Sequence, residues 1–146
     1  MTALASEAAT DAFGRRLAAR LAPGDVVLLS GDLGAGKTAL ARGILAGLGH
    51  AGEVPSPTFT LVQSYEPPGV RLPVWHVDLY RLEDPGEVEE LGLDEILADG
   101  ALLIEWPERA GGRWPEALHL TLTGTGAASR RLTARVPPAW EARWPI

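Results

Sequence analysis

Eight residues near the start of the chain, Gly31 to Thr38, have the G-x-x-x-x-G-K-[ST] spacing of a phosphate-binding loop. Glycines at 31, 34 and 36 permit the unusual backbone dihedrals that turn amide groups toward phosphate oxygens. The Lys37 ammonium would contact the β and γ phosphates of a nucleotide, and the Thr38 hydroxyl would ligate Mg²⁺. Lys37 is also the only lysine among the 13 basic residues. The segment therefore predicts a nucleotide phosphate site.

The residues on either side of the loop predict the elements that would position it. Residues 26–29 are branched and apolar, as in a parallel strand that is buried on both faces. Residues 37–48 carry leucines and an isoleucine at three- and four-residue spacings, which predicts a helix with one buried stripe. The order strand, loop, helix is the context in which this motif binds phosphate, and the helix adds the positive end of its dipole.

Two further side chains are candidates for the same site. The apolar segment 101–106 predicts a strand that presents Glu105 near its end, which is the layout of the second acidic motif in phosphate-loop enzymes. A capping or surface glutamate is the alternative. Thr58 follows the helix 37–48 in a loop, where a switch threonine would lie, although an ordinary loop or capping hydroxyl is equally compatible with its position.

Periodicity predicts the rest of the chain as helices and hairpins. The segment 74–80 would place His76, Asp78 and Tyr80 on a polar face, with the core on the opposite face. The histidines, at positions 50, 76 and 119, are too scattered to indicate a metal site. The remaining predictions are a helix at 6–21, a hairpin of 60–65 with 74–80, a helix from Asp84-Pro85 to Asp99-Gly100, a hairpin of 118–122 with 131–136, and a tail held by Trp140 and Trp144.

Composition narrows the class of protein. The 146 residues, 46% of them apolar, fit a single domain over 1–146. No apolar run is long enough to span a membrane, and the first residues lack a signal-peptide layout, so we expect a cytoplasmic protein with no membrane partner. The chain has no cysteine, and its net charge of −6 argues against non-specific coating of nucleic acid.

Charge is unevenly distributed along the chain. Residues 83–108 hold ten carboxylates and no basic residue, whereas residues 109–146 hold six arginines and two glutamates. Solvated outer surfaces and an electrostatic docking surface for a partner are both compatible with this pattern.

Taken together, the motifs resemble the TsaE (YjeE) family, the ATPases of threonylcarbamoyladenosine tRNA modification. The resemblance covers about residues 10–136. Ala39 departs from the family pattern, which usually has a second threonine or serine after Lys-Thr. The segments that carry the resemblance are Gly-Asp-Leu-Gly-Ala-Gly-Lys-Thr at 31–38, Arg42-Gly43, Ser-Pro-Thr-Phe at 56–59, His-Val-Asp-Leu-Tyr-Arg at 76–81, Leu91-Gly92 and Ile-Glu-Trp-Pro-Glu at 104–108.

The resemblance implies an α/β, single-domain P-loop NTPase fold of three layers, with a mixed, mostly parallel sheet flanked by helices. It implies Mg²⁺-dependent ATP hydrolysis in support of TsaB and TsaD homologues, which modify adenosine 37 of tRNA, so that tRNA is an indirect partner. The implied catalytic residues are Glu105, Asp78 and Lys37. The implied metal ligands are Thr38, Glu105 and Asp78. The implied nucleotide contacts are Gly31, Asp32, Leu33, Gly34, Ala35, Gly36, Lys37, Thr38, Ala39, Thr58 and Trp106.

Two other functions are compatible with a phosphate loop. A stand-alone small-molecule kinase would need an arginine-bearing lid, for which the loop at Arg130-Arg131 is the only plausible segment. A nucleotide-binding adaptor that does not hydrolyse would need Lys37 and Thr38 but not Glu105.

Overall fold

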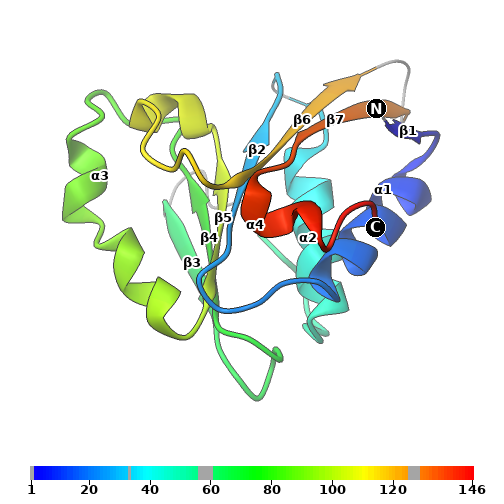
Figure 1. Ribbon diagram of the computed structural model, residues 1–146, viewed down its shortest axis with the longest axis horizontal. Coiled ribbons are helices and arrows are strands. Elements are labelled where there is room, and N and C mark those ends of the chain that lie inside the picture. Colours follow the sequence, from blue (N-terminus) through cyan, green and yellow to red (C-terminus); the bar gives the residue numbers. More distant parts are fainter. Residues whose placement is uncertain (1, 33, 56–60, 125–128) are drawn as a thin grey trace.

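A computed structural model describes residues 2–32, 34–55, 61–124 and 129–146. One mixed sheet of seven strands, in the order β1-β7-β6-β2-β5-β4-β3, crosses the molecule (Figure 1). The elements in chain order are β1 Thr2–Leu4, α1 Glu7–Ala18, β2 Val26–Ser30, α2 Lys37–Gly47, β3 Val62–Tyr65, β4 Val74–Asp78, α3 Glu87–Glu90, the 3₁₀ helix η1 Leu93–Ala98, β5 Ala101–Glu105, the 3₁₀ helix η2 Pro107–Ala110, β6 Leu118–Gly124, β7 Arg130–Arg135 and α4 Pro138–Glu141.

The centre of the sheet is parallel and its edges are antiparallel. β2 pairs in parallel with β5 and with β6, and β5 pairs in parallel with β4. The outer pairings of β3, β7 and β1 are antiparallel. The three central strands β2, β5 and β4 run in the same direction, so their carboxyl ends lie together along one side of the sheet, which is called the sheet edge below. The loop after β2 therefore lies beside the last residues of β5 and β4.

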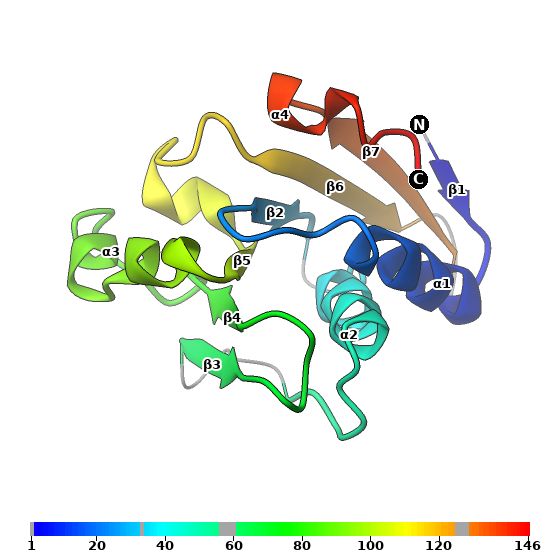
Figure 2. The same ribbon diagram turned by 60° about the horizontal axis from the view of Figure 1, so that its bottom comes forward.

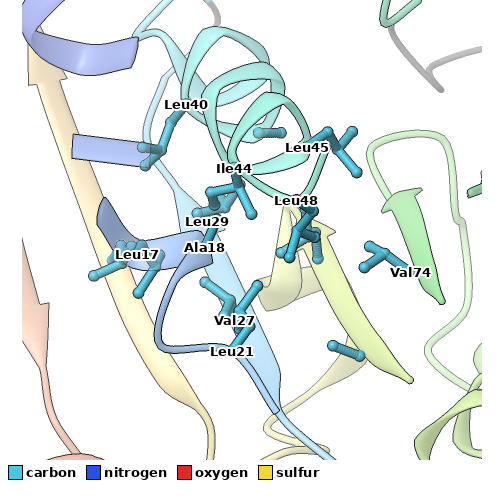
Figure 3. Close-up of a cluster of buried hydrophobic side chains, with 14 of the residues drawn as sticks. Leu17, Ala18, Leu21, Val27, Leu29, Leu40, Ile44, Leu45, Leu48 and Val74 are labelled. Atoms are coloured by element: carbon cyan, nitrogen blue, oxygen red, sulfur yellow. The ribbon is translucent and has the colours of Figure 1, made fainter. Parts of the chain in front are cut away.

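Helices cover both faces of the sheet, so the predicted three-layer α/β fold is confirmed (Figure 2). On one face, α1 and α2 bury side chains against the alternate residues Val27 and Leu29 of β2 (Figure 3). On the other face, Val26 and Leu28 belong to a second buried cluster that also contains Val88 of α3 and Leu93 and Ile96 of η1. Because β2 is buried on both faces, all five of its residues are inaccessible, as its apolar sequence predicts.

α1 and α2 approach so closely that only glycine fits between them. A Cβ on Gly14 would lie 2.8 Å from the backbone nitrogen of Ile44, and one on Gly43 would lie 2.7 Å from the carbonyl oxygen of Asp11. Both are backbone contacts that a side-chain rotation could not relieve. The close crossing fixes the position of α2, whose first turn follows the phosphate loop.

Most predicted elements are confirmed, with one correction. The helix expected to begin at Asp84-Pro85 is two short pieces, α3 and η1, because Gly92 takes a left-handed φ of +62° between them. The face of β4 predicted to be polar does carry His76 and Asp78. Both side chains are buried, at 0% and 3% exposed, because β4 is covered on both faces.

The tail packs on the hydrophobic core, as predicted. Trp140 is 1% exposed and belongs to the core cluster that contains residues of α1 and α2. The Trp144 and Phe13 rings pack edge to face, with 6.2 Å between their centres. In the described ranges, no helix is long and apolar enough to cross a membrane.

Gly43→Ala tests the close helix crossing. Alanine is the better helix former by about 1 kcal/mol, so propensity alone would stabilise the variant. The contact with the Asp11 carbonyl should reverse the sign and lower the free energy of unfolding by about 1–3 kcal/mol, measured by urea denaturation.

Gly52→Ala is the matched control, since the nearest atoms to its new Cβ belong to the His50 side chain at 3.4 Å. Its free energy of unfolding should change by less than about 0.5 kcal/mol. A Gly43→Ala variant as stable as the wild type would contradict the close packing of the helices.

Candidate phosphate site

The segment after β2 has the backbone of a phosphate-binding loop. Gly31, Gly34 and Gly36 have φ values of +144°, +78° and +101°, which L side chains rarely adopt, so the role predicted for these glycines is met by their conformation. Gly36 is the N-cap of α2 and supplies no side-chain hydrogen bond to its first turn. The free amide groups there, with the positive end of the helix dipole, favour an anion at this point.

Lys37 is 5% exposed and lies inside the loop rather than in solvent. Its Nζ donates to the carbonyl oxygens of Gly31 and of Asp32, the latter at 2.9 Å, and lies 4.2 Å from the centre of the Trp106 ring. Burial lowers the pKa of this ammonium below its ordinary value, an effect that nearby carboxylates, Glu105 foremost, oppose. Lys37 is thus a preorganised, poorly hydrated cation, which strengthens its attraction for phosphate.

Glu105, the last residue of β5, contacts the loop directly. The Thr38 hydroxyl lies 3.2 Å from each of the two Glu105 carboxylate oxygens. Asp78 ends the neighbouring strand β4 and is in register with Glu105, so two buried carboxylates stand side by side at the sheet edge. The structure therefore brings Lys37, Thr38 and Glu105 together, as the sequence predicts, and places Asp78 beside them, as the family resemblance implies.

Trp106 turns the chain immediately after Glu105. Its φ of +58° is left-handed, which is costly for a residue other than glycine and directs the indole back over Lys37. The Tyr80 ring packs against it with 4.9 Å between ring centres. The indole thus forms one wall of the phosphate site.

These groups line a single cavity of about 310 Å³. Ala39 is among its lining residues, and its contact with a nucleotide stays a prediction. Leu33 and Thr58 lie outside the described residues, so their predicted contacts stay predictions. The lining residues are Glu7, Gly34, Gly36, Lys37, Thr38, Ala39, Asp78, Glu105, Trp106 and Arg130.

Arg130 is a residue of this cavity that sequence reasoning did not assign to it. From β7, its Nε donates to the Ala35 carbonyl at 2.7 Å and its Nη2 donates to the Gly34 carbonyl at 3.0 Å. A side chain from the far end of the sequence therefore holds two carbonyls of the loop. Only its position in a predicted arginine-rich hairpin end could have suggested it.

His76 is the second residue whose role the sequence did not reveal. Its Nε2 lies 2.6 Å from Glu105 Oε2, and the ring is fully buried. The alternation of side chains along β4 places His76 on the same face as Asp78, and this was the sequence pattern from which its position near the site could have been inferred. The other two histidines lie apart, since His50 Nε2 is 3.0 Å from the Glu53 carbonyl and His119 Nε2 is 2.7 Å from Ser30 Oγ. Burial, with the nearby Arg135, lowers the pKa of His119.

The donor atoms at the sheet edge are those that magnesium prefers. Mg²⁺ is usually held by one or two carboxylates, waters and substrate phosphates rather than by a cage of protein ligands. The Thr38 hydroxyl and the Glu105 and Asp78 carboxylates supply oxygen only, which fits such an ion. No group of three or more His, Cys, Asp and Glu side chains that could hold a metal occurs within the described ranges.

Comparison with known proteins supports the family resemblance that the motifs indicated. The family model of "Threonylcarbamoyl adenosine biosynthesis protein TsaE" matches residues 4–132. A Haemophilus influenzae tRNA threonylcarbamoyladenosine biosynthesis protein TsaE is 53% identical over 93 residues, which cover 63% of this chain and 58% of that protein. The Streptomyces coelicolor protein of the same name is 42% identical over 131 residues, covering 77% of this chain and 88% of that protein.

The fold is also similar to a solved structure. The crystal structure of Bacillus subtilis YdiB superposes with a TM-score of 0.80 and 33% sequence identity, over 97% of this chain and 88% of that one. The fold is that of a P-loop NTPase, a nucleotide-binding fold family, and residues 31–38 carry the phosphate-loop motif at the start of α2.

Arg130→Ala should weaken nucleotide binding because it removes both hydrogen bonds to the loop carbonyls. Hydrogen bonds to a charged group are each worth about 1.5–3 kcal/mol, less where water has access, so we expect a loss of about tenfold in ADP affinity by calorimetry.

Arg131→Ala is the matched control, because the adjacent arginine is exposed and its backbone pairs with Ala3 and Thr123. Its affinity should stay within about twofold of the wild type. Equal losses of ADP affinity in the two variants would show a general effect of positive charge rather than of the Arg130 hydrogen bonds to the loop carbonyls.

Proposed function

This chain belongs to the TsaE family of threonylcarbamoyladenosine biosynthesis proteins, and from that premise we propose that it is a Mg²⁺-dependent ATPase that acts on a complex of TsaB and TsaD homologues. The observation that carries the proposal is the contact between Thr38 and Glu105. A nucleotide-binding adaptor needs the loop alone, whereas hydrolysis needs a carboxylate beside it.

The residues have distinct roles in the proposed reaction. Backbone amides of the loop and the Lys37 ammonium bind the β and γ phosphates, and the Thr38 hydroxyl and the two carboxylates would hold Mg²⁺. The bound ion would neutralise charge that develops on the phosphate oxygens. Glu105 would contact the ion through its water shell, so that its carboxylate is free to orient the attacking water and accept its proton, and the Trp106 wall limits the access of other water.

We further propose that the protein alone is slow. The cavity holds Lys37 and Arg130, but Arg130 donates to loop carbonyls, so it is engaged with the loop rather than extended over a substrate. A partner would then complete the site, for example by excluding water from it. tRNA would be an indirect partner. The same contacts of Arg130 argue against the kinase alternative, which requires an arginine on a moving lid.

Hydrolysis by the purified protein, alone and with its TsaB and TsaD homologues, tests the partner dependence. We expect turnover to rise at least about tenfold when both partners are present, which is 1.4 kcal/mol in the barrier. Fast turnover by the protein alone, unchanged by the partners, would separate the chain from this role and would favour the kinase alternative.

Glu105→Gln tests the catalytic carboxylate. The amide keeps the size of the side chain but cannot accept a proton, so we expect turnover with partners to fall about 10²- to 10⁴-fold while ADP binding is retained. Lys37→Ala should instead abolish nucleotide binding with little change in folding. Glu108→Gln, an exposed carboxylate three residues along the chain, is the matched control. Full activity of Glu105→Gln would favour the adaptor.

A further inference from the structure

His76 lies beneath the phosphate site, on the central part of β4. Its ring is 0% exposed, and its Nε2 is 2.6 Å from Glu105 Oε2. A carboxylate only accepts hydrogen bonds, so the ring nitrogen is the donor and the imidazole carries its proton at Nε2. In the part of the chain that the structure describes, Nδ1 has no hydrogen-bond partner. The one bond that this ring makes there is therefore directed at the proposed catalytic carboxylate.

A role only in core packing accounts poorly for this histidine. A buried nitrogen without a partner costs about 1–3 kcal/mol, which an apolar side chain of similar volume would avoid. Apolar side chains are well accommodated at neighbouring positions of β4, because Val74 and Val77 are both 0% exposed. What the histidine adds is a donor at a fixed point below Glu105.

The strand register holds this donor in place. His76 pairs with Leu103 and Asp78 pairs with Glu105 in the parallel β4–β5 ladder. His76 is therefore diagonal to Glu105 on the same face of the sheet, one step back from the edge. Because both residues lie inside strands, the donor and the acceptor are fixed by backbone pairing rather than by a loop.

Glu105 has a second side-chain donor, but that donor belongs to the reacting groups. The Thr38 hydroxyl lies 3.2 Å from both carboxylate oxygens. In the proposed ATPase this hydroxyl would turn to the metal, and Glu105 would lose it. His76 lies deeper and keeps its contact with Oε2 throughout.

We propose that His76 is a positioning residue that fixes the Glu105 carboxylate through Oε2, so that Oε1 stays directed at the loop and at the attacking water. This inference rests on the proposed ATPase function. The ring does not touch the nucleotide in this role, since it is absent from the residues that line the cavity. Loss of the donor should therefore reduce turnover and leave nucleotide binding intact.

The test compares His76→Gln with His76→Asn. The amide nitrogen of glutamine reaches about as far as Nε2, whereas that of asparagine corresponds to Nδ1 and stops short of Glu105. With TsaB and TsaD homologues present, we expect His76→Asn to lose at least about tenfold in kcat at unchanged KM and unchanged ADP affinity. His76→Gln should recover most of that loss. His50→Gln, remote from the cavity, is the control.

The bond itself has an independent readout. In protein with ¹⁵N-labelled histidine, the Nε2–H proton of His76 should resonate far downfield and should move upfield in Glu105→Gln, whose amide oxygen is a weaker acceptor. Thermal unfolding of each variant shows whether it is folded, and a variant that is not folded is replaced by His76→Phe, which fills the same space without a donor.

The outcomes separate this inference from the function on which it rests. If the wild type does not hydrolyse ATP with its partners, the proposed function is wrong. If the wild type hydrolyses ATP and His76→Asn has the same kcat, the function stands and the positioning role is wrong. Equal losses in the glutamine and asparagine variants would also overturn that role, because they would show dependence on ring packing rather than on the donor.

Discussion

The structure depends on one constraint, which is that three parallel strands end at the same edge of the sheet. β2 delivers the phosphate loop, β5 delivers Glu105, and β4 delivers Asp78. Since the strands are hydrogen-bonded neighbours, Thr38, which follows the loop after β2, and Glu105, at the end of β5, come within 3.2 Å of each other. The chemistry proposed for the site follows from this pairing.

Polarity in the interior is concentrated at that edge. Among the described residues, the buried polar side chains are Thr10, Ser30, Lys37, His76, Asp78 and Glu105, and all but the first lie at or directly below the loop. A buried charge is tolerated only where other groups compensate it. Here Glu105 opposes the effect of burial on Lys37, while Thr38 and His76 contact Glu105. Bound phosphate would add a further anion beside the same ammonium.

The remaining elements hold this edge rigid from a distance. The glycine contacts between α1 and α2 set the position of the helix that begins at the loop. Arg130, the first residue of β7, donates hydrogen bonds to the carbonyl oxygens of Gly34 and Ala35. Residues that are far apart in the chain therefore converge on one short loop, and the strained turn at Trp106 closes it from the side of β5.

The sequence alone predicts the phosphate loop and the strand that presents Glu105, because both depend on the chemistry of neighbouring residues. The glycines and Lys37 define the loop because few other residues can adopt those dihedrals or supply that charge, and the apolar run before Glu105 predicts a buried strand that ends in a carboxylate. Local patterns gave a wrong prediction at Gly92. Apolar periodicity predicts one helix across this residue, whereas the structure has two short pieces, because Gly92 takes a left-handed backbone conformation that the pattern does not reveal.

Only the tertiary structure decided which distant side chains meet. Nothing in the spacing of His76 or Arg130 indicates a partner, since a strand histidine and a hairpin arginine are both ordinary in isolation. Strand order and register bring one under Glu105 and the other onto the loop carbonyls. Such contacts join residues separated by 29 and 95 positions, and packing rather than local pattern determines them.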